Sequence, residues 1–154
     1  MKSQNQHPHE PVLLEETVSA LVTDKNGIYI DCTVGFGGHS FAILQQISKD
    51  GKLFGIDYDP YALEYSKNRL SGLNRSYELF LSNYTELGNL LRTKSIDKVN
   101  GILFDLGISS YQVDSGYKGL SYRIDAPLDM QLGLDQKNNL KDLLHNSTES
   151  EIAN

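Results

Sequence analysis

The chain has 154 residues and a formal net charge of −6, with 39% hydrophobic and 22% charged residues; this predicts one domain with a packed core and argues against global disorder. No apolar run approaches the roughly 20 residues of a membrane helix, the polar N-terminus resembles no secretory signal, and the single cysteine, Cys32, cannot form an internal disulfide, so we expect a cytoplasmic protein. The acidic charge and the scattered Lys and Arg exclude a binder that grips nucleic acid over its whole surface.

Helices and strands alternate along the first two thirds of the chain. We expect residues 1–10 to be a flexible tail and Pro11 to open an amphipathic helix that runs to Val22, because proline suits the first helical turn. Short apolar runs predict buried strands at 28–30, 52–56, 77–81 and 99–104, with helices between them at 41–48, 60–70 and 84–91. Strands and helices that alternate at this spacing form a parallel sheet through βαβ crossovers.

The pattern changes after Asp105. Residues 106–135 are rich in Gly, Ser, Asp and Tyr and show no clear periodicity. A long irregular segment that follows a strand is usually either functional or disordered. Beyond it we expect only a weak helix, at 139–145.

Acidic residues and glycines gather where the predicted strands end. Asp31, Asp57 and Asp105 each end a strand, and the loop GFGGHS at 35–40 leads from the first strand into a helix. Ligands of doubly wound sheets bind at this edge, near the switch point of the strand order. Asp57 stands about 20 residues beyond the loop, where an acid binds ribose hydroxyls in nicotinamide, flavin and S-adenosylmethionine enzymes.

The glycine loop reads GxGGxS, a near miss to the GxGxxG fingerprint of pyrophosphate binding. Acids near both ends of the loop suit a cofactor with an ammonium, a sulfonium and a ribose, and they repel a pyrophosphate. This favours S-adenosylmethionine, with a nicotinamide-binding domain as the open alternative. Asp31 could also be a loop acid, His39 could cap or pack, and Asp59 is expected to cap the helix that Pro60 starts. The histidines form no pattern of metal ligands, so no metal site is predicted.

Five segments carry a resemblance to one family: HEPVLLEE at 9–16, IDCTVGFGGHS at 30–40, GIDYDP at 55–60, DLGISSYQVD at 105–114 and GLSYRIDAPLDM at 119–130. In order and spacing, the chain resembles the bacterial ribosomal RNA cytosine-N4 methyltransferases, which have a mitochondrial relative. The resemblance implies an α/β, Rossmann-like S-adenosylmethionine-dependent methyltransferase, with a partial parallel sheet of about four strands and flanking helices.

The expected reaction suggests roles for individual residues. Asp105 is the candidate catalytic residue, which would accept hydrogen bonds from the target amine. Tyr111 and Tyr122 are candidates to stack on a target base, with ordinary loop packing as the alternative. The residues that correspond to the family's contacts with S-adenosylmethionine are Gly37, Gly38, His39, Asp57, Tyr84, Asp105 and Gln112.

Members of that family are about twice as long as this chain. We therefore expect 11–135 to be an incomplete Rossmann-like domain with an active-site loop at 106–135, and 136–154 to be the start of a truncated helical insert. The expected partner is small-subunit ribosomal RNA in the assembled subunit, with no membrane contact. Two alternatives stay open: a methyltransferase for a small molecule or DNA, and an inactive, truncated cofactor-binding domain that binds a partner through its open sheet edge.

Overall fold

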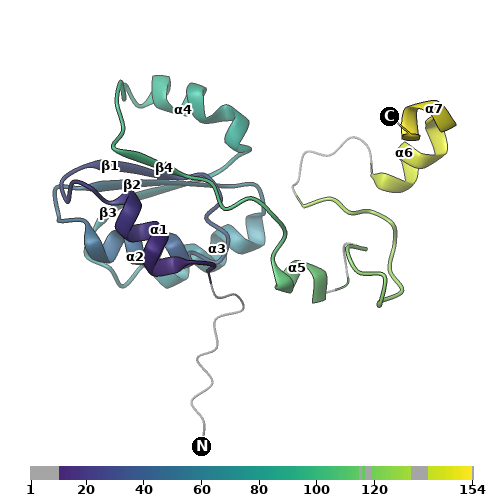
Figure 1. Cartoon of the computed structure of the whole chain (residues 1–154), viewed down its shortest axis with the longest axis horizontal. Helices are drawn as coiled ribbons and strands as arrows, with labels where there is room; N and C mark the ends of the chain where they lie inside the picture. The colour runs from purple at the N-terminus through teal and green to yellow at the C-terminus, as the bar shows by residue number, and fades with distance from the viewer. Residues whose placement is uncertain (1–10, 115, 117–118, 133–138, 154) are drawn as a thin grey trace, which may run out of the picture. The chain divides into compact units, whose positions relative to one another are not determined.

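The computed structural model describes residues 11–114, 116, 119–132 and 139–153 (Figure 1). The predicted tail, 1–10, lies outside these residues. The chain divides into two compact units, 1–107 and 108–154, and each is described by itself. The domain boundaries expected at 135 and 136 stay predictions. In the described part of the chain, no helix is long and apolar enough to cross a membrane.

The first unit contains one sheet of four parallel strands, which confirms the predicted architecture. The strands are β1 (Ile28–Asp31), β2 (Lys52–Asp57), β3 (Ser76–Leu81) and β4 (Gly101–Leu103), and their order across the sheet is β3-β2-β1-β4. Every pair of neighbouring strands is parallel. The chain thus builds outward from β1 to β3 and then crosses back to place β4 on the other side of β1.

Strand β4 has three residues, fewer than the predicted 99–104. At its start, the side chain of Asn100 takes part in the pairing, because its Oδ1 accepts a hydrogen bond from the N–H of Ile28 at 2.9 Å. After its end, the N–H of Asp105 donates to the hydroxyl of Thr33 at 2.7 Å. Side-chain hydrogen bonds therefore supplement the backbone hydrogen bonds from Asn100 to Ile28 and from Cys32 to Leu103 at the two ends, which an apolar run does not reveal.

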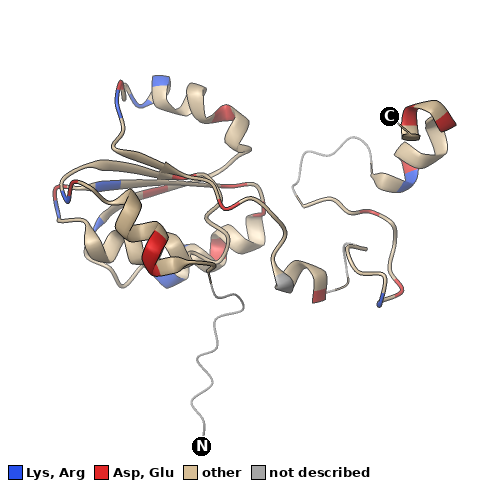
Figure 2. Ribbon diagram, viewed as in Figure 1, with Lys and Arg blue, Asp and Glu red and all other residues tan. Residues whose placement is uncertain are grey.

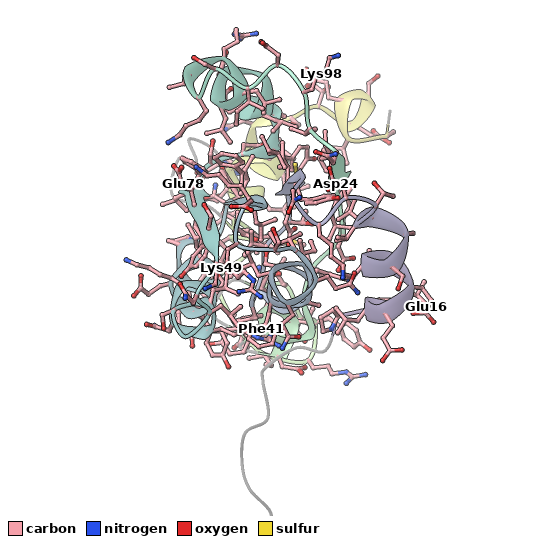
Figure 3. All side chains as sticks on the ribbon, turned by 90° about the vertical axis from the view of Figure 1, so that its left-hand side faces the viewer. Glu16, Asp24, Phe41, Lys49, Glu78 and Lys98 are labelled. Atoms are coloured by element: carbon pink, nitrogen blue, oxygen red, sulfur yellow. The ribbon has the colours of Figure 1, made fainter. Side chains whose placement is uncertain are left out.

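Helices cover both faces of the sheet (Figure 1). Three lie on one face, α1 (Leu14–Leu21), α2 (Gly38–Gln46) and α3 (Pro60–Leu70), while the short 3₁₀ turn η1 (Tyr84–Glu86) and α4 (Leu87–Thr93) lie on the other. Side chains alternate between the two layers as the strand period requires. Tyr29 and Leu53 join the core under α1–α3, whereas Ile30 and Phe54 join the core under α4. Figure 3 shows side chains filling both layers between sheet and helices.

The first helix begins at Leu14, so the prediction that Pro11 opens it was wrong. Pro11 instead packs against the glycine loop, where a Cβ added to Gly38 would lie 2.1 Å from the proline Cγ. Leu13 then takes a left-handed conformation, with φ 50°, before the helix starts. A tertiary contact with the loop thus overrides the local preference of proline for a first helical turn.

The second unit contains three short helices, α5 (Ser110–Asp114), α6 (Leu140–Asn146) and α7 (Glu149–Ala153). The predicted helix at 139–145 is confirmed as α6, with Asn139 as its cap. Helix α5 falls in the segment predicted to be irregular, and α7 was not predicted. Helix α7 begins at a capping box, because the Thr148 N–H donates to Glu151 Oε2 at 2.8 Å and the Glu151 N–H donates to Thr148 Oγ1 at 3.4 Å.

Candidate cofactor-binding site

The switch point of the sheet lies between β1 and β4, because the chain leaves β1 toward β2 and later returns on the other side. The loops that follow these two strands are joined there. The Cys32 N–H donates to the Leu103 carbonyl at 2.9 Å, and the Asp105 N–H donates to the Thr33 hydroxyl at 2.7 Å. The predicted glycine loop and the predicted strand-four acid therefore meet at one place, which is where open α/β sheets bind ligands.

The glycine loop needs glycine at two positions. Gly35 and Gly37 have φ angles of 52° and 75°, in the left-handed region that other residues rarely adopt. Gly37 is also crowded by α3, since an added Cβ would lie 3.0 Å from the Cβ of Ser66. Behind the loop, Arg69 donates to the carbonyl of Phe36 at 3.1 Å. The loop is thus fixed from α3, and its next residue, Gly38, starts α2 with free N–H groups.

Asp57 lies at the end of β2 and is tied to the glycine loop. Its carboxylate accepts hydrogen bonds from the N–H of Gly35 at 2.6 Å and from the N–H of Asp59 at 2.8 Å. Burial raises the pKa of Asp57, and the backbone hydrogen bonds oppose that effect. The backbone N–H of Tyr58 also hydrogen-bonds to this carboxylate. A carboxylate has about four acceptor positions, so about one remains for a ribose hydroxyl. Asp59 caps α3 as predicted, because it accepts from the N–H groups of Tyr61 and Ala62.

Asp31 is fully buried, and its hydrogen bonds lie within the protein. Ser40 Oγ donates to one carboxylate oxygen at 2.7 Å, and the Thr33 N–H donates to the other at 3.1 Å. Burial raises the pKa of Asp31 to about 6, although the Ser40 and Thr33 hydrogen bonds lower it. These contacts favour the alternative in which Asp31 is a loop acid that holds the start of α2.

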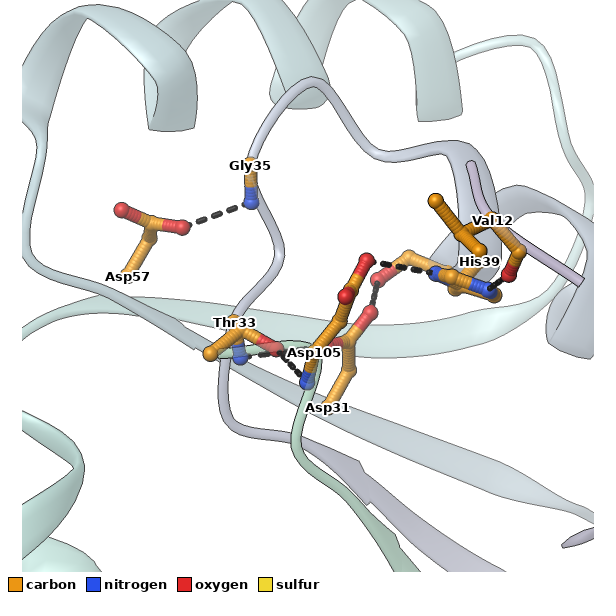
Figure 4. A network of polar contacts seen from close by, with 8 residues as sticks. Val12, Asp31, Thr33, Gly35, His39, Asp57 and Asp105 are labelled. Atoms are coloured by element: carbon orange, nitrogen blue, oxygen red, sulfur yellow. Dashed lines mark hydrogen bonds and ion pairs between the residues drawn. The ribbon is translucent and has the colours of Figure 1, made fainter. Parts of the chain in front are cut away.

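His39 lies between the N-terminal segment and Asp105, in the network drawn in Figure 4. Its Nε2 lies 3.2 Å from the Val12 carbonyl oxygen, and its Nδ1 lies 3.7 Å from Asp105 Oδ2. The His39 side chain is 7% exposed, whereas the Asp105 side chain is 40% exposed. Of the predicted cofactor residues, the structure therefore brings His39, Asp105 and the glycine loop together.

The remaining predicted residues lie in other surroundings. Tyr84 follows β3, and its ring packs edge-on against Phe104 with 5.7 Å between the centroids. Gln112 belongs to the second unit, where it forms a capping box at α5: the Ser109 N–H donates to its Oε1 at 2.9 Å. Tyr122 is 94% exposed, and the guanidinium of Arg123 lies 5.7 Å from its ring centroid. The cofactor and base contacts of these residues stay predictions.

Acidic residues outnumber basic ones around the strand ends. Asp31 and Asp57 end β1 and β2, and the loops that follow the strands add Asp59 and Asp105. One cation lies at these loops, because the Arg69 guanidinium of α3 donates to the Phe36 carbonyl. Figure 2 shows this acidic edge of the sheet. Such an edge attracts a cation, such as an ammonium or a sulfonium, and repels phosphate. Among the residues that the structure describes, no cluster of three or more His, Cys, Asp or Glu side chains could hold a metal ion.

Three contributors to the site were missed in the sequence. Thr33 joins the two loops through its hydroxyl, Ser40 holds Asp31, and Val12 contributes a backbone carbonyl. Thr33 and Ser40 lie within the same motif as the glycines, so the sequence could have identified their hydroxyls as candidate hydrogen-bonding groups. The Val12 carbonyl has no sequence signal, because every residue carries one.

The fold and the site define a Rossmann-like class of protein, and solved structures agree. An rRNA-methylase from Clostridium thermocellum matches with a TM-score of 0.54 and 20% identity, over 62% of this chain and 52% of that one. NSun6 from Pyrococcus horikoshii matches with a TM-score of 0.51 and 20% identity, over 62% of this chain and 24% of that one. At such low identity these likenesses show the fold alone.

The sequence model of the MraW methylase family matches residues 6–154, and the chain belongs to this family. Ribosomal RNA small subunit methyltransferase H of Fusobacterium nucleatum is 41% identical over 145 residues, which are 94% of this chain and 46% of that protein. The protein of the same name from Mycoplasma capricolum is 43% identical over 138 residues, 90% of this chain and 45% of that protein. The chain spans about half the length of the curated relatives it matches.

Proposed function

We propose that this chain is the S-adenosylmethionine-binding half of a methyltransferase that acts on small-subunit ribosomal RNA. The observation that carries the proposal is the convergence of the glycine loop, Asp57 and Asp105 at the switch point, joined by hydrogen bonds from Gly35 and to Thr33. The names of the relatives and the family match support the substrate class. The resemblance of the DLGISSYQVD and GLSYRIDAPLDM segments supports the N4 amine of a cytosine as the group that is methylated.

The residues present fit S-adenosylmethionine, which supplies an electrophilic methyl group when bound. Asp57 has an acceptor position for a ribose hydroxyl, and the acidic edge suits the positive charges of the methionyl part. The left-handed glycines let a ligand approach the backbone closely. We assign cofactor binding to Gly37, Gly38, His39, Asp57, Tyr84, Asp105 and Gln112.

Methyl transfer to the N4 amine requires the protein to position a weak nucleophile. The lone pair of a cytosine N4 amine is delocalised into the ring, so the amine must be held in line with the methyl group. Asp105 suits this task, because its backbone is fixed by Thr33 while its carboxylate is partly exposed. A carboxylate that accepts hydrogen bonds from the amine also stabilises the positive charge that develops on nitrogen. Tyr111 and Tyr122 would stack on the base once it has left its helix.

The proposal places the protein in the cytoplasm, where the small subunit is assembled. The net charge of −6 supports few phosphate contacts by this chain on its own. We therefore propose that part of the RNA contact comes from the half of the relatives that the chain does not match.

A transfer assay tests this function. Small ribosomal subunits are incubated with S-adenosylmethionine labelled in its methyl group and with either this chain or a form extended to the length of the relatives. We expect label in small-subunit RNA, at cytosine N4 after digestion, and loss of that label in Asp105→Asn. Label in DNA or in a small molecule instead of RNA would contradict the substrate.

A further inference from the structure

We propose that Arg69 is a positioning residue for the glycine loop: its guanidinium holds the carbonyl of Phe36 and thereby fixes a peptide group that the neighbouring glycine leaves free to rotate. The inference rests on the proposed function and deepens it, because it adds a residue that acts on the cofactor site from behind the loop. Arg69 lies on α3, and none of the residues that we assign to cofactor binding belongs to that helix.

The peptide group between Phe36 and Gly37 is held at both of its polar ends. Its N–H, on Gly37, donates to the Val34 carbonyl at 2.8 Å, and its carbonyl, on Phe36, accepts from Arg69 Nη1 at 3.1 Å. The first of these hydrogen bonds closes a turn within the loop itself, whereas the second comes from another element. Arg69 therefore ties this peptide group to the body of the domain.

The sequence of the loop makes such a tie necessary. Rotation of the peptide group changes ψ of Phe36 and φ of Gly37, and glycine adopts positive and negative φ about equally well. Gly37 has φ 75° and no Cβ whose clashes would oppose the change. Rotation would turn the Phe36 carbonyl away from α3, break the hydrogen bond to Val34 and redirect Gly37, which is the N-cap of α2. The N–H groups at the start of α2, which the proposed site offers to the cofactor, would be redirected with it.

Arg69 is itself held in place by packing. It is half-buried, and burial lowers the pKa of its guanidinium, which stays charged at neutral pH. Its Cζ lies 5.5 Å from the ring centroid of Phe41 in α2, a favourable cation–π distance. One turn earlier on the same face of α3, Tyr65 packs edge-on against the Phe36 ring, with 5.2 Å between the centroids. Helix α3 thus holds both the ring and the carbonyl of Phe36.

The same loop carries a hydrogen bond that orients Asp57. The N–H of Gly35, one residue before Phe36, donates to Asp57 Oδ2 at 2.6 Å. A loop released from Arg69 therefore loses its alignment at two places that the proposed site uses, the start of α2 and the Asp57 carboxylate. We expect this loss to appear as weaker cofactor binding by a chain that is still folded.

Arg75 provides a matched control for Arg69. Its Nε also donates to a main-chain carbonyl at 3.1 Å, that of Ile47, which lies at the other end of α2. Arg69→Ala and Arg75→Ala each remove one such bond, and both should lower the midpoint of urea unfolding. Arg69→Lys is a milder variant, because it keeps the charge and most of the stem but lacks the planar guanidinium.

Calorimetric titration of the folded 154-residue variants with S-adenosylmethionine tests the proposal. We expect Arg69→Ala to bind about tenfold more weakly than the parent chain, the scale of one lost hydrogen bond from a charged group, and Arg69→Lys to show a smaller loss. Arg75→Ala should bind like the parent. Guanidinium ion, added far below its denaturing concentrations, should restore most of the affinity of Arg69→Ala, an effect that a merely structural role does not produce.

Amide hydrogen exchange gives a second readout that needs no ligand. The Gly37 N–H should exchange faster in Arg69→Ala than in the parent chain or in Arg75→Ala, because its hydrogen bond to Val34 opens when the peptide group rotates. Equal Gly37 exchange in all three folded chains would overturn the proposed tie.

The proposal is also overturned if the Arg69 variants, measured as folded chains, bind S-adenosylmethionine like the parent, if Arg75→Ala loses as much affinity, or if guanidinium leaves Arg69→Ala unchanged. Should Arg69→Ala fail to fold, Arg69→Lys decides by the same comparison with the parent and with Arg75→Ala. A folded parent chain that does not bind S-adenosylmethionine contradicts the proposed function itself, which keeps the two failures apart.

Discussion

The two aspartates at the strand ends that meet at the switch point differ in burial and in hydrogen bonding. Asp31, after β1, is fully buried, and Ser40 and Thr33 hydrogen-bond to its two oxygens. Asp105, after β4, is partly exposed, and its oxygen faces His39 at a distance too long for a hydrogen bond. The hydrogen bonds of Asp31 are therefore completed by the protein, whereas the carboxylate of Asp105 is partly exposed, and we propose that it accepts hydrogen bonds from a ligand.

Strands β1 and β4 differ in burial in the same way as the aspartates at their ends. Tyr29 and Ile30 of β1 are fully buried, whereas Ile102 of β4 is 39% exposed and Phe104, just beyond β4, is 45% exposed. An aspartate on a buried strand must be satisfied internally, since an unpaired buried charge is costly. An aspartate beside an exposed strand can keep free acceptor positions in water. Between these two acids, the one beside the exposed strand is therefore the one that a ligand can reach.

The largest expected effect is on the pH dependence of stability. Burial raises the pKa of Asp31 from 3.8 to about 6 in the folded chain, so the folded chain binds this proton more tightly than the unfolded chain. The free energy of unfolding should therefore fall by about 3 kcal/mol as pH rises from about 3 to about 7. Asp31→Asn should remove this fall, as measured by urea unfolding across that range.

Ser40→Ala is the matched control for this pH effect. The Ser40 hydrogen bond lowers the pKa of Asp31, so its loss should make the fall with pH steeper while the carboxylate stays. Equal slopes in the parent chain and in Asp31→Asn would contradict the account of a carboxylate that costs stability once ionised.

Substitution of Asp57 should lower the affinity for S-adenosylmethionine. We expect Asp57→Ala to weaken S-adenosylmethionine by about 1–3 kcal/mol, the scale of a lost charged hydrogen bond, in a calorimetric titration. Asp59→Ala is the control, because it removes the cap of α3 and should lower the free energy of unfolding by about 1 kcal/mol without changing affinity. An unchanged affinity in Asp57→Ala would remove this residue from the site.

Alanine substitutions in the glycine loop should separate the cost of backbone strain from the cost of steric crowding. Gly35 and Gly37 both have positive φ, but an added Cβ at Gly35 meets only the Thr33 carbonyl oxygen at 3.9 Å, whereas at Gly37 it meets Ser66 at 3.0 Å. Gly35→Ala should therefore cost about 1 kcal/mol and Gly37→Ala about 2 kcal/mol of the free energy of unfolding. A larger loss from Gly35→Ala, measured by urea unfolding, would show that the loop has another conformation.

The smallest effect should come from the link between the two loops. Thr33→Val keeps the side-chain shape but removes the acceptor for the Asp105 N–H, with an expected loss of about 1 kcal/mol of the free energy of unfolding. Thr33→Ser keeps the hydroxyl and should lose less. Should Ser and Val lose the same amount, the methyl group rather than the hydrogen bond would be the stabilising part.

The parallel sheet, and the gathering of glycines and aspartates at its strand ends, could be predicted from the sequence. Short apolar runs separated by segments of helical length indicate buried parallel strands. The strand ends at Asp31 and Asp57 were correct for that reason. The start of α1 was not, since Pro11 packs against a glycine that follows 27 residues later. Contacts made by backbone groups across such distances, like the Val12 carbonyl with His39, leave no pattern in the sequence. Short helices such as α5 depend on local capping rather than on periodicity, so an apolar pattern does not find them.

The central claim is that the glycine loop and the acidic strand ends bind S-adenosylmethionine rather than a dinucleotide. Isothermal titration of the chain with S-adenosylmethionine and, separately, with NAD tests it most directly. The account predicts saturable binding of S-adenosylmethionine and none of NAD, because the acidic edge repels a pyrophosphate. Binding of NAD alone, or of neither ligand by a folded chain, would contradict it.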